Sequence, residues 1–329
     1  METPPQTLKV LVIRLSSIGD IILTTPVLDA LKKAHPAAVV DYLVMDVYQE
    51  AIAGNQCVDR LILFDKQRYR GLSGILRFCR THAVHDYDII IDLHAKLRSV
   101  LMTLFIRGRV LRYCKRSWWK SLAVPLRLTR YHVNDTIVRN YFGPLQRLGI
   151  AYEGEKPTFN VSPDDRQAVQ VYGGAVVMAP GAAFNTKKWP AEHFAALGRR
   201  LQGMIVLIGG GEDTALCDGI QREIGHRCVN LAGRLTLKQS GALMSLARYV
   251  VCNDSAAFHM ARGVGTPAFV IFGPTDPGMF TYDDAAVLLR HPVACAPCSL
   301  HGDRCCPQGH FACMRDLTPE KVLAVIEGG

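Results

Sequence analysis

The sequence predicts an α/β protein with two Rossmann-like domains, each built on a doubly wound parallel sheet, that face each other across a cleft. Short apolar runs alternate with stretches of helical periodicity along the chain. This alternation occurs twice, and a segment without periodicity separates the two series. The chain has 329 residues, which is enough for two domains with a hydrophobic core in each.

The first series contains four predicted strands, at residues 8–13, 39–44, 60–64 and 87–93. Each is short and rich in aliphatic residues, which is typical of strands in a parallel sheet covered by helices. Helical spacing of apolar residues follows the first strand, as in VLDALKKAHP, and the third, as in GLSGILRFCR. We therefore expect an N-terminal α/β domain.

The second series predicts strands at residues 175–180, 204–210, 248–254 and 267–273. The two series are joined by AYEGEKPTFNVSPDD, which is rich in Gly, Pro and acidic residues. We place the domains at residues 1–155 and 156–329, with a final helix that could pack back on the N-terminal domain. Ligands of such sheets bind beyond the carboxyl ends of the strands, so the loops that follow strands hold the candidate site residues.

Composition excludes several classes of protein. Hydrophobic residues make up 49% of the chain, which excludes a disordered protein. No apolar run reaches the length of a membrane-spanning helix, and METPPQTLKV lacks the features of a secretory signal. We therefore expect a cytoplasmic protein, in which the 11 cysteines are better explained as buried thiols or metal ligands than as disulfides.

The positive charge lies in the first half of the chain. Residues 1–150 contain 22 Lys and Arg against 12 Asp and Glu, whereas residues 151–329 contain 16 against 17. Ten basic residues and no acidic one lie between His94 and Asn134, with Trp118 and Trp119 among them. A solvated basic face explains such a run, and so does a surface that binds a polyanion: nucleic acid, acidic lipid or a phosphorylated substrate.

The loop SSIGD follows the first predicted strand and opens a helix. The backbone N–H groups of a helix N-terminus favour an anion, and Gly19 allows another group to approach the backbone. The loop has neither the GxGxxG spacing of a dinucleotide site nor the pattern of a P-loop. From this loop alone, Ser17 and Asp20 are equally well explained as helix caps and as functional groups.

Two loops of the second domain carry polar residues at strand ends. APGAAFNTKKWP places Lys187 and Lys188 where α/β domains hold phosphates, although surface lysine pairs are common. NDSAAFHMA places Asp254 and Ser255 at the end of a strand, and His259 lies one helical turn beyond Ser255. Helix capping and a core histidine are the alternative explanations, but they leave the convergence of all three on one strand end unexplained.

Five cysteines near the C-terminus follow the pattern C-x2-C-x6-C-C-x6-C, with His301 and His310 nearby. This number of thiols in a short span could hold zinc, although the spacing is not that of a standard zinc finger. Redox thiols and simple packing remain open. The five are Cys295, Cys298, Cys305, Cys306 and Cys313.

Taken together in their order, these motifs resemble glycosyltransferase family 9, the ADP-heptose:lipopolysaccharide heptosyltransferases. The resemblance implies a GT-B-type fold, with the acceptor bound by the N-terminal domain and the nucleotide sugar by the C-terminal one. The matching segments are VLVIRLSSIGDIILTTP, YDIIIDLHAKLRS, APG…TKKWP, GGGED, NDSAAFHMA and CPQGHFACM.

The resemblance assigns roles to individual residues. Asp20 matches the proposed general base, which takes the proton of a sugar hydroxyl as the new bond forms. Lys187 matches the lysine expected to neutralise charge on the departing diphosphate. Ala256 stands where the family usually has glycine, and its methyl group narrows the approach to the phosphates. The donor-binding set is Thr186, Lys187, Gly211, Glu212, Asp254, Ser255, Ala256 and His259.

The implied acceptor is a phosphorylated lipopolysaccharide core at the inner face of the inner membrane, where the protein would bind peripherally. Such a polyanion would account for the charge asymmetry. The expected donor is ADP-heptose, transferred with inversion and without a cofactor or catalytic metal, so that any zinc on the cysteines would be structural. Another nucleotide sugar for a different glycan is an alternative, as is a basic nucleic-acid-binding protein, although we expect no nucleic acid. The acceptor-binding set is Ser17, Gly19, Lys66, Arg68, Arg70, His94 and Arg98.

Overall fold

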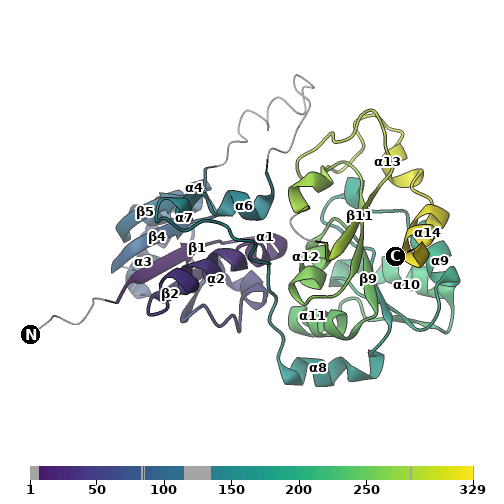
Figure 1. The fold of residues 1–329 in the computed structure, drawn as a ribbon, viewed down its shortest axis with the longest axis horizontal. Helices are drawn as coiled ribbons and strands as arrows, with labels where there is room; N and C mark the ends of the chain where they lie inside the picture. The colour runs from purple at the N-terminus through teal and green to yellow at the C-terminus, as the bar shows by residue number, and fades with distance from the viewer. Residues whose placement is uncertain (1–6, 83, 85, 115–134, 282–283, 329) are drawn as a thin grey trace, which may run out of the picture. The chain divides into compact units, whose positions relative to one another are not determined.

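The computed structural model describes residues 7–82, 84, 86–114, 135–281 and 284–328, which form two compact units (Figure 1). The first unit contains the described residues up to 114 and residues 135–159, and the second begins at Asn160. This division falls a few residues beyond the expected domain boundary. The basic stretch between His94 and Asn134 lies partly outside the described residues, which include neither Trp118 nor Trp119.

The first unit is built on a five-stranded parallel sheet with the strand order β3-β2-β1-β4-β5. The order reverses between β1 and β4, so the loops after these two strands meet at a switch point. The sequence predicts every strand except β5, in which three arginines interrupt the apolar residues. The strands are β1 (Lys9–Ile13), β2 (Val39–Met45), β3 (Arg60–Phe64), β4 (Asp86–Asp92) and β5 (Arg107–Arg112).

Helices cover this sheet through apolar faces. Phe78 of α3, for example, packs edge-on against Phe64 of β3, with ring centroids 4.9 Å apart. The predicted helix after β1 is divided in two, because a new helix begins at Thr25 with Pro26 in its first turn. The elements are α1 (Ile18–Ile22), α2 (Thr25–Ala34), the 3-10 helix η1 (Asp46–Ala51), α3 (Gly71–Thr81), α4 (Leu97–Thr103), α6 (Ile137–Tyr141) and α7 (Gly143–Gln146).

The second unit is built on a six-stranded parallel sheet with the strand order β11-β10-β9-β6-β7-β8. Its switch point lies between β6 and β9. Two strands are not predicted from the sequence: β8, which has only three residues, and the edge strand β11. The strands are β6 (Val176–Ala179), β7 (Ile205–Leu207), β8 (Cys228–Asn230), β9 (Tyr249–Asn253), β10 (Ala268–Phe272) and β11 (Ala286–Arg290).

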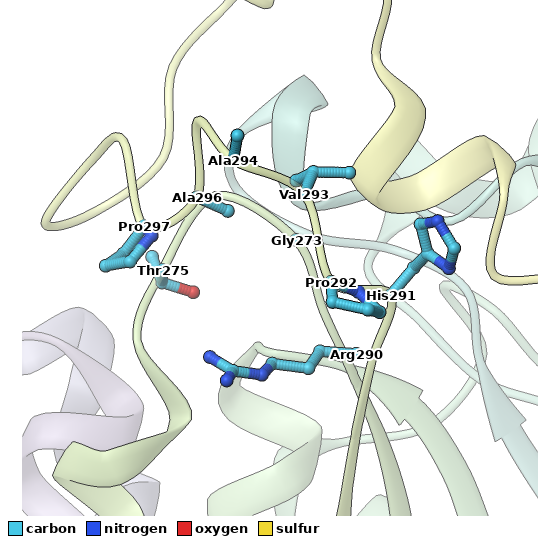
Figure 2. Close-up of a pocket in the computed structure, with 9 residues that line it drawn as sticks. All are labelled: Gly273, Thr275, Arg290, His291, Pro292, Val293, Ala294, Ala296 and Pro297. Carbon is cyan, nitrogen blue, oxygen red and sulfur yellow. The ribbon is translucent and has the colours of Figure 1, made fainter.

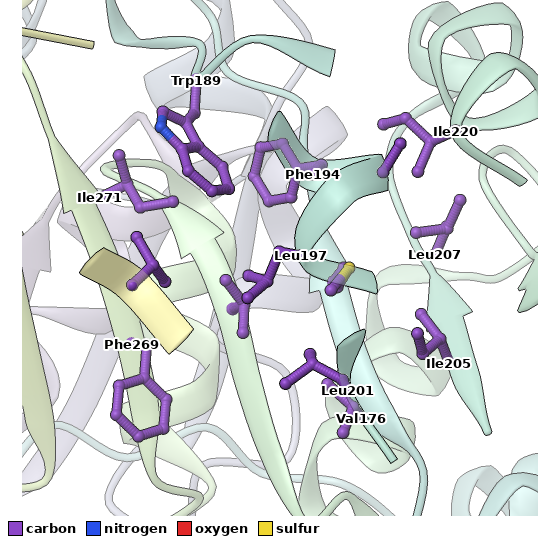
Figure 3. Close-up of a cluster of buried hydrophobic side chains, with 14 of the residues drawn as sticks. Val176, Trp189, Phe194, Leu197, Leu201, Ile205, Leu207, Ile220, Phe269 and Ile271 are labelled. Carbon is purple, nitrogen blue, oxygen red and sulfur yellow. The ribbon is translucent and has the colours of Figure 1, made fainter. Parts of the chain in front are cut away.

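The core of the second unit lies between this sheet and α9, as Figure 3 shows. Phe194 and Leu197 of α9 are fully buried beside Trp189, whose indole N–H donates to the Leu317 carbonyl at 2.8 Å. The helices are α8 (Pro163–Val169), α9 (Ala191–Arg200), α10 (Thr214–Ile224), α11 (Leu237–Leu246), α12 (Ala256–Gly263), α13 (Ala312–Arg315) and α14 (Pro319–Gly328). The 3-10 helices are η2 (Gln170–Tyr172), η3 (Asn185–Lys187), η4 (Gly211–Asp213) and η5 (Pro277–Phe280).

The final helix α14 packs against α9, and its Val322 is fully buried in the core of the second unit. It is therefore part of that unit by its contacts. Among the described residues, no helix has both the length and the apolar character needed to cross a bilayer.

Candidate functional site

Two groups of polar residues lie at the carboxyl ends of strands, one in each unit. The first surrounds Asp20, in the loop and short helix that follow β1. Asp20 Oδ2 lies 2.5 Å from the Arg14 guanidinium and accepts a hydrogen bond from the Ser17 hydroxyl at 3.2 Å. Asp20 Oδ1 accepts from the Tyr141 hydroxyl at 3.2 Å. Both oxygens of this carboxylate are therefore held in place.

Arg14 is buried although it is charged, with 3% of its surface exposed. Its guanidinium also donates to the carbonyls of Ser16 and Leu93, both at 2.7 Å. Burial opposes its charge, but Tyr141 and Asp20 raise the pKa of Arg14 above its ordinary value. Burial raises the pKa of Tyr141 well above its usual range, so this hydroxyl stays protonated and donates. Neither residue is among the candidate site residues predicted from the sequence.

The helix-cap explanation accounts for part of this geometry. Ser17 is the N-cap residue of α1, and its N–H contacts Asp20 Oδ2 at 3.5 Å. A cap alone leaves the contacts with Arg14 and Tyr141 unexplained. The Asp20 side chain keeps 39% of its surface exposed, so a substrate hydroxyl could reach it, and Gly19 is buried in the same turn.

The basic residues predicted for the acceptor follow β3. Arg68 and Arg70 line a pocket of about 300 Å³ with Arg77 of α3, whereas Lys66 is exposed nearby in sequence. Arg77 donates to the Arg68 carbonyl at 2.9 Å, and both guanidinium groups lie 5.4 Å from the ring centre of Tyr69. Arg77, which lies within α3, is not among the residues predicted from the sequence. This pocket has the charge needed to bind a phosphate.

His94 and Arg98 lie in the segment after β4. The buried Asp92 carboxylate orders this segment by accepting from the His94 N–H at 3.1 Å and from the Ser99 hydroxyl at 3.1 Å. His94 is buried, and its N–H also bonds to the Ile13 carbonyl of β1 at 3.1 Å. Arg98 is partly exposed over the Phe64 ring, 5.8 Å from its centre. The structure thus places His94 beside the loop of Asp20, and Arg98 beside the strand that leads into the basic pocket.

The second group lies around Lys187 in the second unit. Lys187 Nζ is 2.6 Å from Asp254 Oδ2, and the Thr275 hydroxyl donates to the same oxygen at 2.7 Å. The side chains of Lys187 and Asp254 are 15% and 5% exposed. An ion pair in this position holds the ammonium group where β6 and β9 end. Thr275 is the third member of this group, and it is not predicted from the sequence.

The loop that carries Lys187 is fixed at two further points. The Thr186 hydroxyl accepts from the Asp303 N–H at 2.7 Å and donates to the Asp303 carbonyl at 3.0 Å. The amide of Asn253, fully buried at the end of β9, bonds the Pro180 carbonyl at 2.7 Å and the Trp189 N–H at 3.1 Å. These contacts leave the main chain around Lys187 little freedom.

The helix α12 begins directly after this ion pair. Ser255 is its N-cap residue, and its side chain makes no capping hydrogen bond among the described residues. Ala256 begins the helix, so a small side chain occupies the first turn. His259 is buried against the rings of Phe258 and Phe280, whose centroids lie 4.7 and 5.2 Å from its own. Donor binding by these three residues stays a prediction.

The predicted residues Gly211 and Glu212 lie in η4, after β7. Both are exposed, whereas the next residue, Asp213, is buried and accepts from the Gly210 N–H at 3.1 Å. The loop after β6 approaches this carboxylate closely: a Cβ on Gly181 would lie 2.3 Å from it. Asp213 therefore joins two loops of the site, and donor binding by the exposed Glu212 stays a prediction.

The cysteine-rich segment lies against the loop of Lys187. Within the described chain, no three His, Cys, Asp or Glu side chains are arranged to hold a metal ion. Cys295 Sγ lies 3.7 Å from the His310 ring, and burial and neighbouring thiols raise the pKa of Cys313 to about 11. All five thiols are free. The structural zinc stays a prediction, and the observed role of this segment is to pack against Thr186 and Lys187.

Comparison with known proteins identifies relatives across the chain. The sequence is 27% identical to lipopolysaccharide heptosyltransferase 1 of Pseudomonas aeruginosa, in an alignment that covers 88% of this chain and 86% of that protein. It is 26% identical to lipooligosaccharide heptosyltransferase 2 of Haemophilus influenzae, covering 96% and 97% of the two chains.

Solved structures resemble the whole chain. A glycosyltransferase family 9 protein from Veillonella parvula aligns with a TM-score of 0.79 at 22% identity, covering 98% of this chain and 96% of that one. Escherichia coli heptosyltransferase WaaC with ADP-2-deoxy-2-fluoro heptose aligns with a TM-score of 0.71 at 19% identity, covering 98% and 99%. These likenesses show the fold and confirm the predicted GT-B class. The model of glycosyltransferase family 9 (heptosyltransferase) matches residues 75–306, and the chain therefore belongs to this family.

Proposed function

We propose that this enzyme transfers a heptose from ADP-heptose to the phosphorylated inner core of lipopolysaccharide, with inversion at the anomeric carbon and without a catalytic metal. The observation that carries the proposal is the carboxylate of Asp20, partly exposed and held at both oxygens. Family membership and the related heptosyltransferases support the sugar and the donor.

The transfer needs a base and a stabilised leaving group. Asp20 accepts the proton of the acceptor hydroxyl while that oxygen forms a bond to the anomeric carbon. The bond from that carbon to the diphosphate breaks, and ADP departs with its negative charge, which Lys187 neutralises. ADP needs no proton to depart, so a second carboxylic acid of the kind that glycoside hydrolases use is unnecessary.

The acceptor is recognised by charge. Arg68, Arg70 and Arg77 line a pocket in the same unit as Asp20, and guanidinium groups bind phosphate in a bidentate manner. The same basic half of the chain would bring the protein to an anionic membrane surface at the cytoplasmic face. Sedimentation with vesicles of anionic lipid, but not with neutral ones, would test this peripheral association.

Replacing Asp20 with Asn tests the catalytic assignment. Asp20→Asn should reduce heptose transfer by at least about a thousandfold. The affinity for ADP should stay within about twofold of the wild-type value, because Asp20 lies in the first unit and the residues proposed for the donor lie in the second. The change leaves the buried Arg14 without its counter-charge, so thermal unfolding must accompany the assay. Asp164→Asn, at an exposed position of α8, is the matched control. Near-normal turnover of a folded Asp20→Asn variant would refute the assignment.

Calorimetric titration tests the donor. Binding of ADP and ADP-heptose, with weaker binding of UDP and none of a short oligonucleotide, is the expected result. Preference for UDP would indicate a different glycan, and salt-sensitive binding of the oligonucleotide alone would indicate nucleic acid. A structural zinc on the five thiols is tested by elemental analysis before and after treatment with a chelator. Loss of the zinc should leave the transfer chemistry intact.

A further inference from the structure

The pocket of about 240 Å³ that Figure 2 shows lies at the ends of β10 and β11, beside the group around Lys187. Thr275 lines it, and the Thr275 hydroxyl donates to Asp254, the partner of Lys187. This pocket is therefore part of the candidate site already described. The basic pocket of the first unit has a different setting, because helices with exposed leucines lie beside it.

The helices α3 and α4 of the first unit carry these leucines. Leu72 of α3 is 55% exposed, and Leu97 and Leu104, at the two ends of α4, are 75% and 70% exposed. Leu97, Val100 and Leu104 are spaced by three and four residues, so they lie on one side of α4. The side of a helix that faces water normally carries polar residues. An apolar row in that position indicates a surface that contacts a partner.

The two helices share one outer surface. Their inner sides pack on the same face of the sheet, where Ile75 and Phe78 of α3 and Met102 of α4 belong to one buried cluster. The helices also contact each other, so their outer sides are adjacent. We call this surface the α3–α4 face, and its exposed residues are Leu72, Arg77, Arg80, Lys96, Leu97 and Leu104.

Positive charge surrounds the leucines of this face. Residues 66–85 and 93–114, which include both helices, contain five Lys or Arg each and no Asp or Glu. Lys96 directly precedes Leu97, and Arg80 is exposed in the last turn of α3. Basic side chains are attracted to the phosphates of anionic lipids, while apolar side chains beside them enter the boundary of the acyl chains.

This combination favours a bilayer over other partners. Nucleic acid would match the charge of the face but would leave three exposed leucines without a function. A second copy of the chain would cover the leucines but would bring two surfaces of the same charge together. An anionic bilayer matches both the charge and the apolar side chains.

The position of the face suits an acceptor that is anchored in lipid. Because α3 follows β3 and α4 follows β4, both helices begin at the carboxyl edge of the sheet, where Asp20 and the basic pocket also lie. Leu72 and Leu97 lie in the first turns of the two helices. An acceptor with its acyl chains in a bilayer at this face would have its sugars at the edge of the sheet that carries the proposed base.

We propose that the α3–α4 face binds an anionic bilayer, with Leu72, Leu97 and Leu104 inserted at the boundary of the acyl chains and the basic residues around them on the lipid phosphates. The inference rests on the proposed function for its lipid-linked acceptor. It adds to that function the surface and the apolar side chains that hold the protein on the membrane.

Sedimentation with vesicles of phosphatidylethanolamine and phosphatidylglycerol tests the proposal. Replacing Leu97 and Leu104 together with Gln should weaken binding about tenfold or more, because buried apolar area is lost. Val171→Gln is the matched control, since Val171 is 76% exposed in the second unit, and it should stay within about twofold of the wild-type chain. Replacing Arg80 and Lys96 together with Gln should weaken binding about tenfold at low salt and reduce its salt dependence.

Three outcomes would overturn the inference. The first is failure of the wild-type chain to bind these vesicles. The second is equal binding by the wild-type chain and the double leucine variant, or equal loss in Val171→Gln. The third is the absence of vesicle binding together with another partner for the face: a dimer that the double leucine variant loses, or an oligonucleotide that the Arg80 and Lys96 variant releases.

Heptose transfer to a water-soluble core oligosaccharide without acyl chains tests the proposed function separately. None of the substituted residues belongs to the proposed donor or acceptor sets, so each variant should keep this activity within about twofold. Such transfer with loss of vesicle binding in the double leucine variant supports the inference. Absence of transfer by the wild-type chain would instead refute the proposed function, whatever the vesicles show.

Discussion

Tyr141 fixes the second oxygen of Asp20, at a position 121 residues further along the chain. A general base must point its free lone pair at the proton it removes, and small errors of orientation are costly. Arg14 and Ser17 hold one carboxylate oxygen, and Tyr141 holds the other. Tyr141 is therefore a positioning residue for the proposed base, and no local pattern in the sequence indicates it.

Removing this hydroxyl should affect the chemical step more than donor binding. We expect Tyr141→Phe to lower kcat about five- to tenfold and to leave the KM for ADP-heptose within about twofold, since one hydrogen bond is lost. Tyr42→Phe is the control: Tyr42 is also fully buried, and its hydroxyl shares a hydrogen bond with the Thr24 hydroxyl at 2.8 Å. Steady-state kinetics at fixed temperature measure both. An equal loss of kcat in the control would reduce Tyr141 to a structural role.

Lys187 and Lys188 are adjacent in sequence but differ in environment. Lys187 pairs with the buried Asp254, whereas no ion pair of Lys188 occurs among the described residues. Lys187→Ala should weaken ADP binding at least about tenfold and lower turnover as well, while Lys188→Ala should change either by less than about threefold. Titration with ADP measures the difference. Similar losses in the two variants would assign the role to general positive charge in this loop.

The cysteine-rich segment acts, at the scale of elements, as a support for the Lys187 loop. Its main chain at Asp303 exchanges hydrogen bonds with Thr186, and a Cβ on Gly302 would lie 2.9 Å from Lys187 Cγ. Gly302 has φ +94°, which disfavours other residues. The N–H groups of Cys298 and Ser299 bond to the Pro274 carbonyl, beside Thr275. Loops after β6 and β10 are thus held by one segment.

Thr186→Val keeps the shape of the side chain and removes the two hydrogen bonds that the hydroxyl makes with Asp303. The hydrogen bond from the Thr186 backbone N–H to the Asp303 carbonyl is kept. We expect a loss of about 1–3 kcal/mol in the free energy of unfolding of the second unit, faster proteolysis near Asp303 and weaker ADP binding. Thr186→Ser retains the hydroxyl and should behave like the wild-type chain. Urea unfolding, limited proteolysis and ADP titration measure these effects. Unchanged proteolysis and ADP affinity in Thr186→Val would show that the two segments act independently.

Sequence reasoning predicts elements well where burial imposes an apolar pattern. The central strands β1 and β9 are continuous apolar runs, and both precede loops of the candidate site. Edge strands such as β5 carry charges on their exposed residues, and β8 is too short to show a pattern. Arg14 has a local signal, because a lone charge follows a buried strand. Asp213 ends the GGGED motif, which is visible in the sequence, whereas Thr275 has no local signal, since tertiary contacts alone place it beside the other site residues.

At the scale of the whole molecule, both units contain buried thiols whose titration couples pH to stability. Burial raises the pKa of Cys79 in the first unit from 9.0 to about 11, and it has the same effect on Cys228 and Cys313 in the second. Burial also raises the pKa of Cys217 to about 12. The folded state therefore prefers the neutral thiols, whereas the unfolded chain releases these protons near the ordinary pKa.

This preference gives stability below about pH 9 that is lost as the pH rises through the folded-state values of 11 to 12. Each thiol should remove up to about 1.4 kcal/mol of unfolding free energy per pH unit between its ordinary pKa of 9.0 and its raised folded-state pKa. Urea unfolding between about pH 8 and pH 11 measures the slope. Cys79→Ala should reduce the slope for the first unit, whereas Cys305→Ala, at an exposed position, should leave both slopes unchanged. If the slope of Cys79→Ala equals that of the wild-type chain, other groups cause the alkaline loss and the buried thiol does not contribute to it.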